Sequence, residues 1–408
     1  WPIPLATDIA FALAVFAVAA TWWIFEVVPI GVTSLLIGTL QALFLIRKPA
    51  VAFKDYMDPS VLFIFGSVVI GMVFTKTGLT RRIAYKMLSI IGEKTSLIML
   101  GCFVMTALLT HVMAHTAVAA TMFPLLMAIY SLYTTEKAPT NFGKCLFMGM
   151  AYVAGAGSIV TLLGAARGAV ALGFYKDMMN VDISFGTLTY YMFPLGWLLV
   201  FLLWGFFLVL CKPEKDRIVG LKEKASRMYR ELGGITRNEI LAAVIIFAAV
   251  LLIALKSFVP ALENLDKTGI LLCSTIAFFV FNILKIDDLE DIPWNIILLF
   301  AGAMSIGFCL WETGAAKWLA VNWLVLFQKA PAVVFIMGMS FFVLVMTNFI
   351  MNVAAIAISL PVALVIAPYL GVAGEVILFS ALATAGMPFI LLIGAAPNAI
   401  AYNSKQFT

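Results

Sequence analysis

The sequence predicts an all-α polytopic membrane protein made of two inverted-topology repeats, and two observations carry this prediction. The first is composition: of 408 residues, 63% are hydrophobic and only 12% are charged. A soluble domain is typically about half apolar and about a quarter charged, so most of this chain suits a lipid environment. The second observation is an internal duplication of three sequence blocks, which occur in the same order in both halves.

The expected membrane spans follow from apolar runs of about 20 residues, the length needed to cross a bilayer. We expect spans near residues 8–25, 28–46, 59–75, 144–164, 190–211, 238–258, 268–284, 293–310 and 375–395. Two longer apolar stretches, 95–133 and 331–370, are interrupted near the middle by polar residues and by Pro124 or Pro361. Because the chain begins at Trp1 without Met and stops after a polar break at Thr408, we also expect flanking helices outside it.

The duplicated blocks keep their glycine, threonine and proline positions in register. "LFIFGSVVIGMVFTKTGLTRRIA" (62–84) aligns without a gap with "LLFAGAMSIGFCLWETGAAKWLA" (298–320), at an offset of 236 residues. With one inserted residue, 110–124 aligns with 347–361, and "LLGAARGAVA" (162–171) aligns with "LIGAAPNAIA" (392–401). Chance similarity between apolar helices would not preserve these positions, so the two halves are predicted to be structural repeats.

The distribution of basic side chains predicts that the repeats are inverted in the membrane. Basic residues cluster after the first block and again in the linker 211–237, and cytoplasmic loops carry such an excess. The segment after the second block is less basic, which fits the opposite side. Arg47, Lys48 and Lys54 are an exception, because this topology places them outside. We therefore divide the chain into a first repeat with its preceding scaffold helices (8–210), a cytoplasmic linker (211–237) and a second repeat (238–408).

Two glycine-rich segments, "GAARG" (164–168) and "GAAPN" (394–398), interrupt apolar spans at matching places in the two halves. Non-helical backbone at membrane depth is tolerated where it is buried in protein or lines a wet cavity. Inverted repeats with broken spans are typical of secondary transporters. Freed amides and helix N-termini at such breaks can face an anion.

Both histidines of the chain lie in one uncharged run, "THVMAHTAVAA" (110–120), one helical turn apart at His111 and His115. No acidic or basic residue occurs between Lys94 and Glu136. Two histidines on one helix face would suit zinc, but a third ligand is wanting nearby. An intramembrane metalloenzyme is therefore a remote alternative. Of the two histidines, His111 is expected to pack behind His115.

These motifs resemble those of the divalent anion:Na+ symporter family, whose members carry dicarboxylates, citrate or sulfate. The tips of the two interrupted stretches read Ala114-His115-Thr116-Ala117 and Met351-Asn352-Val353-Ala354, where the family has Ser-Asn-Thr motifs. The resemblance implies re-entrant hairpins at 95–133 and 331–370, broken helices at 164–168 and 394–398, and a homodimer in the inner or plasma membrane. It also implies an elevator mechanism, in which hairpins and broken helices move together against a scaffold.

The departures from the family pattern concern its sodium sites. At the first site this chain has Thr110, Ala114, His115 and Gly164, with Arg167 nearby in place of a proline. Hard cations prefer oxygen ligands, so we expect this site to be lost. The second site keeps matching residues, and Na+ is expected only there, if at all: Thr347, Asn352 and Gly394. No other cofactor is expected.

The predicted function is exchange of dicarboxylates of the C4 or 2-oxoglutarate class, resembling the family's Na+-independent branch. Arg167 and His115 would supply the positive charge that Na+ supplies in symporters, because an unpaired buried dianion is very costly. Arg167 could instead snorkel to an interface. The expected substrate contacts are His115, Thr116, Arg167, Gly168, Asn352, Val353 and Asn398, supported from behind by Thr110, His111, Ala114 and Pro397.

The main alternative is a Na+-coupled di- or tricarboxylate symporter, or a sulfate symporter, that uses the second cation site. The net charge of +5 is small for the length and is spread over connecting segments, so we expect lipid and small anions as partners and no nucleic acid. The five cysteines have no metal-like spacing and are expected to be small buried hydrophobic residues.

Overall fold

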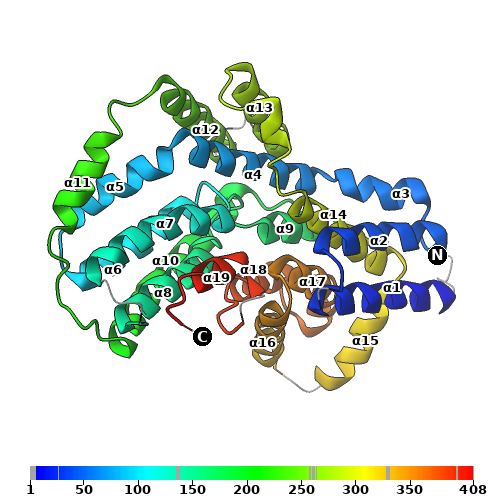
Figure 1. Cartoon of the computed structure of the whole chain (residues 1–408). Coiled ribbons are helices and arrows are strands. Elements are labelled where there is room, and N and C mark those ends of the chain that lie inside the picture. The colour runs from blue at the N-terminus through cyan, green and yellow to red at the C-terminus, as the bar shows by residue number, and fades with distance from the viewer. Residues whose placement is uncertain are drawn as a thin grey trace. The chain divides into compact units, whose positions relative to one another are not determined.

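The computed structural model describes residues 6–25, 27–134, 138–256, 259, 262, 264–327, 331–391 and 394–407, and its regular elements there are helices (Figure 1). In the first half these are α1 (Ala6–Phe25), α2 (Ile30–Leu43), α3 (Pro49–Lys54), η1 (Asp55–Met57), α4 (Pro59–Thr77), α5 (Leu79–Ile91), α6 (Thr95–Thr110), α7 (His115–Tyr133), α8 (Asn141–Gly157), α9 (Ala166–Met179) and α10 (Phe185–Leu210). The linker and second half contain α11 (Leu221–Glu231), α12 (Arg237–Leu255), α13 (Lys267–Val280), η3 (Ile286–Leu289), α14 (Trp294–Glu312), α15 (Ala315–Phe327), α16 (Ala332–Phe349), α17 (Asn352–Ile366), η4 (Ala367–Leu370), α18 (Gly374–Ala385) and α19 (Ala396–Tyr402).

The helices form two compact units, each drawn from both halves of the sequence. Unit 1 comprises residues 1–65, 166–183 and 292–390, and unit 2 comprises residues 66–165, 184–291 and 391–408. These units group helices by packing. The predicted repeats at 8–210 and 238–408 are instead defined by duplicated sequence blocks. This division into repeats stays a prediction.

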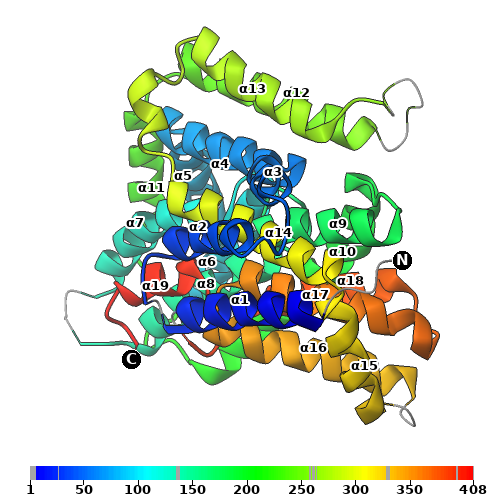
Figure 2. The same cartoon turned by 90° about the vertical axis from the view of Figure 1, so that its right-hand side faces the viewer.

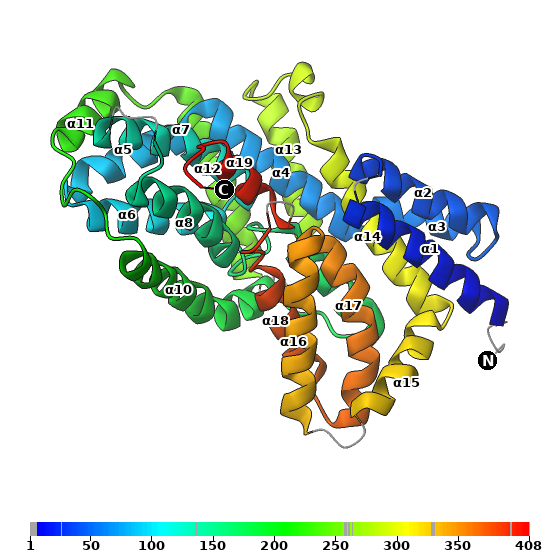
Figure 3. The same cartoon turned by 60° about the horizontal axis from the view of Figure 1, so that its bottom comes forward.

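Unit 1 is organised around α14, which packs against α2, α9 and α17. Nearly every residue of α14 from Leu299 to Leu310 is buried, so this helix forms the apolar centre of the unit. Helix α17 is equally buried and packs against α15, α16 and α18 (Figure 3). Burial on all sides is what an evenly apolar helix sequence requires.

Unit 2 is organised around α8, which packs against α6, α7, α10 and α19. Its face toward these neighbours is rich in glycine and alanine ("AYVAGAG", 151–157), and small side chains let helices approach closely. Helices α12 and α13 also pack against each other and lie side by side in Figure 2.

Eight helical segments of the described residues are long and apolar enough to cross a membrane, which agrees with the multi-span membrane protein predicted above. They are Thr7–Phe25, Pro49–Thr77, His115–Tyr133, Phe185–Leu210, Arg237–Leu255, Trp294–Glu312, Ala332–Phe349 and Asn352–Leu370.

Four of the expected spans are shorter than predicted. The span near 144–164 is α8, which ends at Gly157, and the span near 375–395 is α18, which ends at Ala385. The span near 28–46 is α2, which ends at Leu43 because Leu45 adopts a positive φ of 51° and reverses the chain. The span near 268–284 is α13, which ends before Asn282 at a φ of 56°. A left-handed residue cannot continue a right-handed helix, and neither turn is signalled by glycine or proline in the sequence.

The duplicated Thr-Gly pairs adopt the same local structure. Gly78 has φ +85° and Gly314 has φ +77°, a conformation that glycine adopts without strain. The hydroxyl of Thr77 and that of Thr313 each donate to the carbonyl four residues earlier, at 2.7 and 2.6 Å. The chain therefore turns in the same way from α4 into α5 and from α14 into α15, which explains why these residues stay in register.

Arg47, one of the exceptions to the charge rule, is neutralised inside unit 1. Its guanidinium donates to Asp55 and to both carboxylate oxygens of Glu312, at 2.8 and 2.7 Å for the latter. It also donates to Gln41, whose amide donates to Ser305 at 2.9 Å. Burial alone would lower the pKa of Arg47, but the two carboxylates raise it. A buried, paired cation is not a loop charge, so Arg47 need not obey the charge rule.

The expectation that all five cysteines are buried is confirmed at four positions and wrong at Cys273, and it missed one disulfide. Cys145 and Cys211 form a disulfide with a Cα–Cα distance of 6.3 Å, and Cys273 is exposed. Cys102 and Cys309 are buried and free as predicted. The pairing escaped sequence reasoning because the two cysteines are 66 residues apart and meet only through the packing of α8 against α10.

Candidate functional site

The two interrupted apolar stretches fold into helix pairs with short turns at their tips. Helix α6 ends at Thr110 and α7 begins at His115, whereas α16 ends at Phe349 and α17 begins at Asn352. The residue before each second helix is extended, with φ and ψ of −59° and 136° for Ala114 and −58° and 142° for Met351. Each tip therefore presents the first turn of a helix.

His115 is fixed to the first glycine-rich break by two contacts to one carbonyl. Its backbone amide donates to the Gly164 carbonyl at 2.9 Å, and its Nδ1 lies 3.2 Å from the same oxygen. A carbonyl oxygen can only accept, so Nδ1 carries the proton in this contact. The other ring nitrogen, Nε2, then accepts when the ring is neutral and donates when it is protonated.

Gly164 stands where three backbone segments converge. A Cβ atom at this position would lie 2.4 Å from the Thr110 carbonyl oxygen and 2.8 Å from both the Cα and the carbonyl oxygen of Ser158. These are backbone atoms, which cannot rotate away. Only glycine fits here, which accounts for the start of the "GAARG" motif.

The prediction that the two histidines share one helix face is wrong, because α6 ends at Thr110 and α7 begins only at His115. His111 packs beside the contact between His115 and Gly164. Its ring lies 5.8 Å from the ring of Trp197 and 6.5 Å from that of Phe193, both on α10. Its backbone carbonyl accepts a hydrogen bond from the Thr161 hydroxyl at 2.9 Å. Thr161 was not singled out from the sequence. Its one signal is that it lies three residues before Gly164 in the same uncharged run.

The second break brings Asn398 into unit 2, on a helix that packs against α7 and α8. Pro397 and Asn398 occupy the first turn of α19 and are buried, as is Gly394 just before it. The amide nitrogen of Asn398 donates to the Leu391 carbonyl at 3.0 Å. Unit 2 therefore holds His115, Thr116 and Asn398 at the starts of two helices that contact each other.

Arg167 and Gly168 lie in unit 1, in the first turn of α9. Only 1% of the Arg167 surface is exposed, and it is among the largest fully buried side chains of the described residues. This burial argues against an arginine that snorkels to an interface. Helix α9 packs against α17, whose first turn supplies Asn352 and Val353, and both of these are buried.

The second tip is also tied to the segment before its break. The Asn348 side chain accepts from the Ile390 amide at 2.8 Å and donates to the Leu344 carbonyl at 2.7 Å. The Thr347 hydroxyl is buried and donates to the Ala385 carbonyl at 3.1 Å. This bond uses its proton and leaves oxygen lone pairs that suit a hard cation.

Each of the predicted substrate contacts lies in the first turn of a helix. His115 and Thr116 begin α7, Arg167 and Gly168 begin α9, Asn352 and Val353 begin α17, and Asn398 begins α19. Helix N-termini carry partial positive charge and unpaired amides, which attract anions. The structure describes these residues within their own units, so their joint contact with one substrate stays a prediction. The same holds for Thr347, Asn352 and Gly394 as cation ligands.

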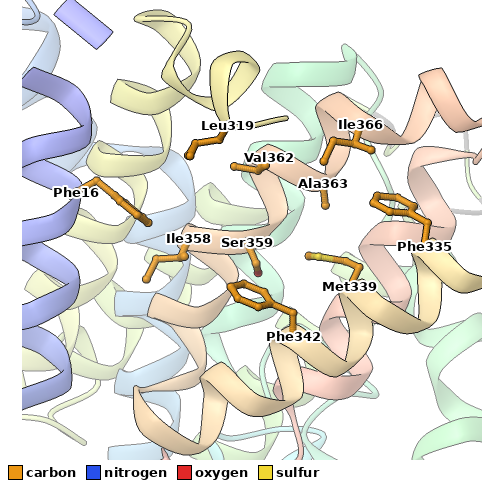
Figure 4. A pocket seen from close by; sticks show the side chains of 10 residues that line it. All are labelled: Phe16, Leu319, Phe335, Met339, Phe342, Ile358, Ser359, Val362, Ala363 and Ile366. Carbon is orange, nitrogen blue, oxygen red and sulfur yellow. The ribbon is translucent and has the colours of Figure 1, made fainter. Parts of the chain in front are cut away.

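A cavity of about 140 Å³ in unit 1 has a different character (Figure 4). Its walls are apolar apart from one hydroxyl, that of Ser359, which donates to the Ala355 carbonyl at 2.6 Å. The lining residues come from α1, α15, α16 and α17: Phe16, Leu319, Phe335, Met339, Phe342, Ile358, Ser359, Val362, Ala363 and Ile366. Such walls offer no counter-charge to an anion.

A metal-dependent enzyme finds no support in the side chains. Among the described residues, no group of three or more histidine, cysteine, aspartate or glutamate side chains lies close enough to hold a metal ion.

Comparison with known proteins gives a consistent result over the full length. Residues 1–408 match the family described as "Sodium:sulfate symporter transmembrane region". The chain is 25% identical to the Sodium-dependent dicarboxylate transporter SdcS of Staphylococcus saprophyticus, covering 100% of this chain and 82% of that protein. It is 27% identical to the protein of the same name from Staphylococcus aureus strain USA300, covering 98% and 80% respectively.

Proposed function

The chain belongs to the sodium:sulfate symporter family, and from that premise we propose that it carries small dicarboxylates across the membrane. As a member of this family it is a multi-pass membrane transporter and not an enzyme. The named relatives are dicarboxylate transporters, which favours this substrate class. The observation that carries the proposal is the fully buried Arg167 at the start of α9, beside a glycine-rich break.

A dicarboxylate brings about two negative charges into a low-dielectric site and needs compensation there. The guanidinium of Arg167 suits a bidentate grip on one carboxylate. His115 is held by the Gly164 carbonyl at 2.9 Å, and Gly164 precedes Arg167 by three residues. Three residues of extended chain span at most about 11 Å, and this short covalent connection supports the proposal that both side chains contact one substrate. Thr116, Gly168, Asn352, Val353 and Asn398 complete the proposed contacts.

Symport of dicarboxylate with Na+ is the transport mode that the two relatives favour, because both are named as sodium-dependent. The proposed cation ligands are the Thr347 hydroxyl, the Asn352 amide and the backbone at Gly394. Oxygen donors of this kind suit a hard monovalent or divalent cation.

Exchange without Na+ is the second candidate, and the first tip favours it. Ala114 and His115 replace oxygen ligands there, and Arg167 is a permanent charge that cannot leave the protein as a bound cation can. In the proposed elevator, hairpins 95–133 and 331–370 and the broken helices move as one body within each protomer of a homodimer. In the absence of substrate, moving a charged arginine through the bilayer centre costs from about 3 to over 10 kcal/mol. Even about 3 kcal/mol slows the empty return more than a hundredfold, which enforces exchange.

The deciding experiment is uptake of labelled succinate into proteoliposomes that are empty or loaded with dicarboxylate, with and without Na+. Uptake into empty liposomes that requires Na+ supports symport, whereas uptake that requires internal dicarboxylate at zero Na+ supports exchange. Competition by malate, 2-oxoglutarate, citrate, tartrate and sulfate defines the substrate class. Competition by sulfate alone would refute the dicarboxylate proposal.

Substitutions assign the charged residues. Arg167→Ala and His115→Asn are expected to weaken dicarboxylate transport at least tenfold, since each removes a charge-assisted contact worth about 1.5 kcal/mol or more. Arg237→Ala, which removes an exposed arginine at the start of α12, is the matched control and is expected to transport normally.

A further inference from the structure

Helices α5 and α11 lie where apolar spans end. Helix α5 begins directly after the span that ends at Thr77, and α11 lies between the spans that end at Leu210 and begin at Arg237. The two helices pack side by side (Figures 1 and 3). Arg82 of α5 donates to both carboxylate oxygens of Glu239, in the first turn of α12, at 2.8 and 3.0 Å. This ion pair fixes α5 beside the start of the span formed by α12.

The segment that leads into α11 is fastened to the loop after α5. The Ile218 amide donates to the Glu93 carbonyl at 2.9 Å, and the Gly220 amide donates to the Glu93 carboxylate at 2.9 Å. In return, the Thr95 amide donates to the Asp216 carbonyl at 3.0 Å. These bonds make α5 and α11 one surface with a fixed arrangement.

This surface carries exposed cations. On α11, Leu221 and Ala225 are buried against the protein, while basic side chains point outward. The exposed basic residues of the two helices are Arg81, Lys86, Lys222, Arg227 and Arg230. The exposed acids on α11 are Glu223 and Glu231, and Glu231 is paired with Arg227 at 3.7 Å. The surface therefore has an excess of positive charge.

The same surface leaves apolar side chains uncovered. Ile83 and Ile90 are 41% and 69% exposed and lie on one face of α5, with Lys86 between them. Val219, just before α11, is 82% exposed. Bare branched aliphatic residues among cations are typical of a helix that lies in the headgroup region, with its apolar side chains in the acyl boundary.

We propose that the α5–α11 surface, with Lys86, Lys222 and Arg230, binds the headgroups of anionic phospholipids while Ile83 and Ile90 insert beneath them. Clustered lysine and arginine on amphipathic helices next to membrane spans attract anionic lipid. The isoleucines favour a lipid surface over nucleic acid, which offers them no apolar environment, and the position of both helices next to membrane spans favours lipid over a soluble acidic protein. This inference does not depend on which anion is transported.

The test is photolabelling of the intact protein in phosphatidylcholine vesicles that contain a trace of photoactivatable phosphatidylglycerol, with the labelled peptides mapped by mass spectrometry. Label is expected on residues 79–91 and 219–231, and photoactivatable phosphatidylcholine is expected to label them several-fold less. Each lost basic residue weakens anionic-lipid binding about fivefold. The triple variant Lys86→Gln, Lys222→Gln, Arg230→Gln is therefore expected to need on the order of a hundredfold more phosphatidylglycerol for equal labelling.

The control variant removes three exposed lysines from other elements: Lys54→Gln, Lys317→Gln and Lys405→Gln. It is expected to label like the unaltered protein. Labelling of the unaltered protein in 0.5 M salt provides a readout without mutation and is expected to fall, because surface charge is screened. The proposal is overturned if both lipids label equally, if the control loses as much label as the triple variant, if salt has no effect, or if soluble glycerol phosphate competes as well as phosphatidylglycerol.

Discussion

Replacing Gly164 by alanine tests the convergence of backbone segments beside His115. The added Cβ would meet the Thr110 carbonyl oxygen at 2.4 Å and two backbone atoms of Ser158 at 2.8 Å. Contacts this short cannot be relieved by a side-chain rotation, so a backbone segment must move. Because the His115 amide donates to the Gly164 carbonyl at 2.9 Å, the movement also displaces the first turn of α7.

The size of the effect follows from three terms. Overpacking of a closed site costs about 1–3 kcal/mol, and loss of the His115 amide bond adds about 1 kcal/mol. Alanine restricts the unfolded chain and returns about 0.4–1 kcal/mol. The net expectation for Gly164→Ala is a loss of about 2 kcal/mol in the free energy of unfolding, with dicarboxylate transport reduced at least tenfold through the misplaced histidine.

The assay compares detergent-purified variants by thermal unfolding and by counterflow in proteoliposomes. Gly205→Ala is the matched control, since Gly205 lies inside α10 and a Cβ there meets nothing within 4 Å. Helix propensity predicts that this control is as stable as the unaltered protein or about 0.5–1 kcal/mol more stable. If Gly164→Ala has the same melting temperature and counterflow rate as Gly205→Ala, the inference that three backbone segments converge at Gly164 is wrong.

Three further predictions concern stability. Arg47→Gln is expected to cost about 3–5 kcal/mol, because it leaves the buried Asp55 and the half-exposed Glu312 without the cation that both of them share; a melting temperature equal to that of the unaltered protein would contradict this. Gly78→Ala is expected to cost about 1–2 kcal/mol from left-handed backbone strain alone, since no atom lies within 4 Å of the new Cβ, and denaturant unfolding measures it. Glu214→Gln is expected to cost about 0.5 kcal/mol at pH 7. Burial opposes ionisation of Glu214, but hydrogen bonds from two backbone amides and a tyrosine hydroxyl hold its pKa below the usual value. The difference in free energy of unfolding between Glu214→Gln and the unaltered protein should therefore be complete above about pH 4.3 and vanish as the pH falls through the lowered pKa. A difference that persists in acid would refute the stabilising role of the ionised carboxylate.

Sequence reasoning reached the membrane class and the repeat motifs, but it placed His111 and His115 on one helix face, whereas a turn separates them. The membrane class and the repeat motifs could be predicted because they depend on local composition: apolar runs define spans, and glycine and proline interrupt them wherever they occur. The Thr77-Gly78 and Thr313-Gly314 turns show this clearly, since a positive φ is a property of the residue itself.

Contacts between residues far apart in the chain could not be predicted from the sequence. Arg47 reaches Glu312 across 265 positions, and Cys145 meets Cys211 across 66. Nothing in either neighbourhood signals its partner, because the pairing depends on which helix faces meet.

By itself, then, the sequence determined that this chain is an all-helical membrane protein whose apolar stretches are interrupted at two tips and two breaks, because periodicity and backbone freedom are encoded residue by residue. Only the tertiary structure decided that Gly164 holds His115, that Arg167 is buried rather than at a surface, and that Arg47 is neutralised. These outcomes depend on close packing and on the low dielectric constant of a buried site, which exist only once the helices have assembled.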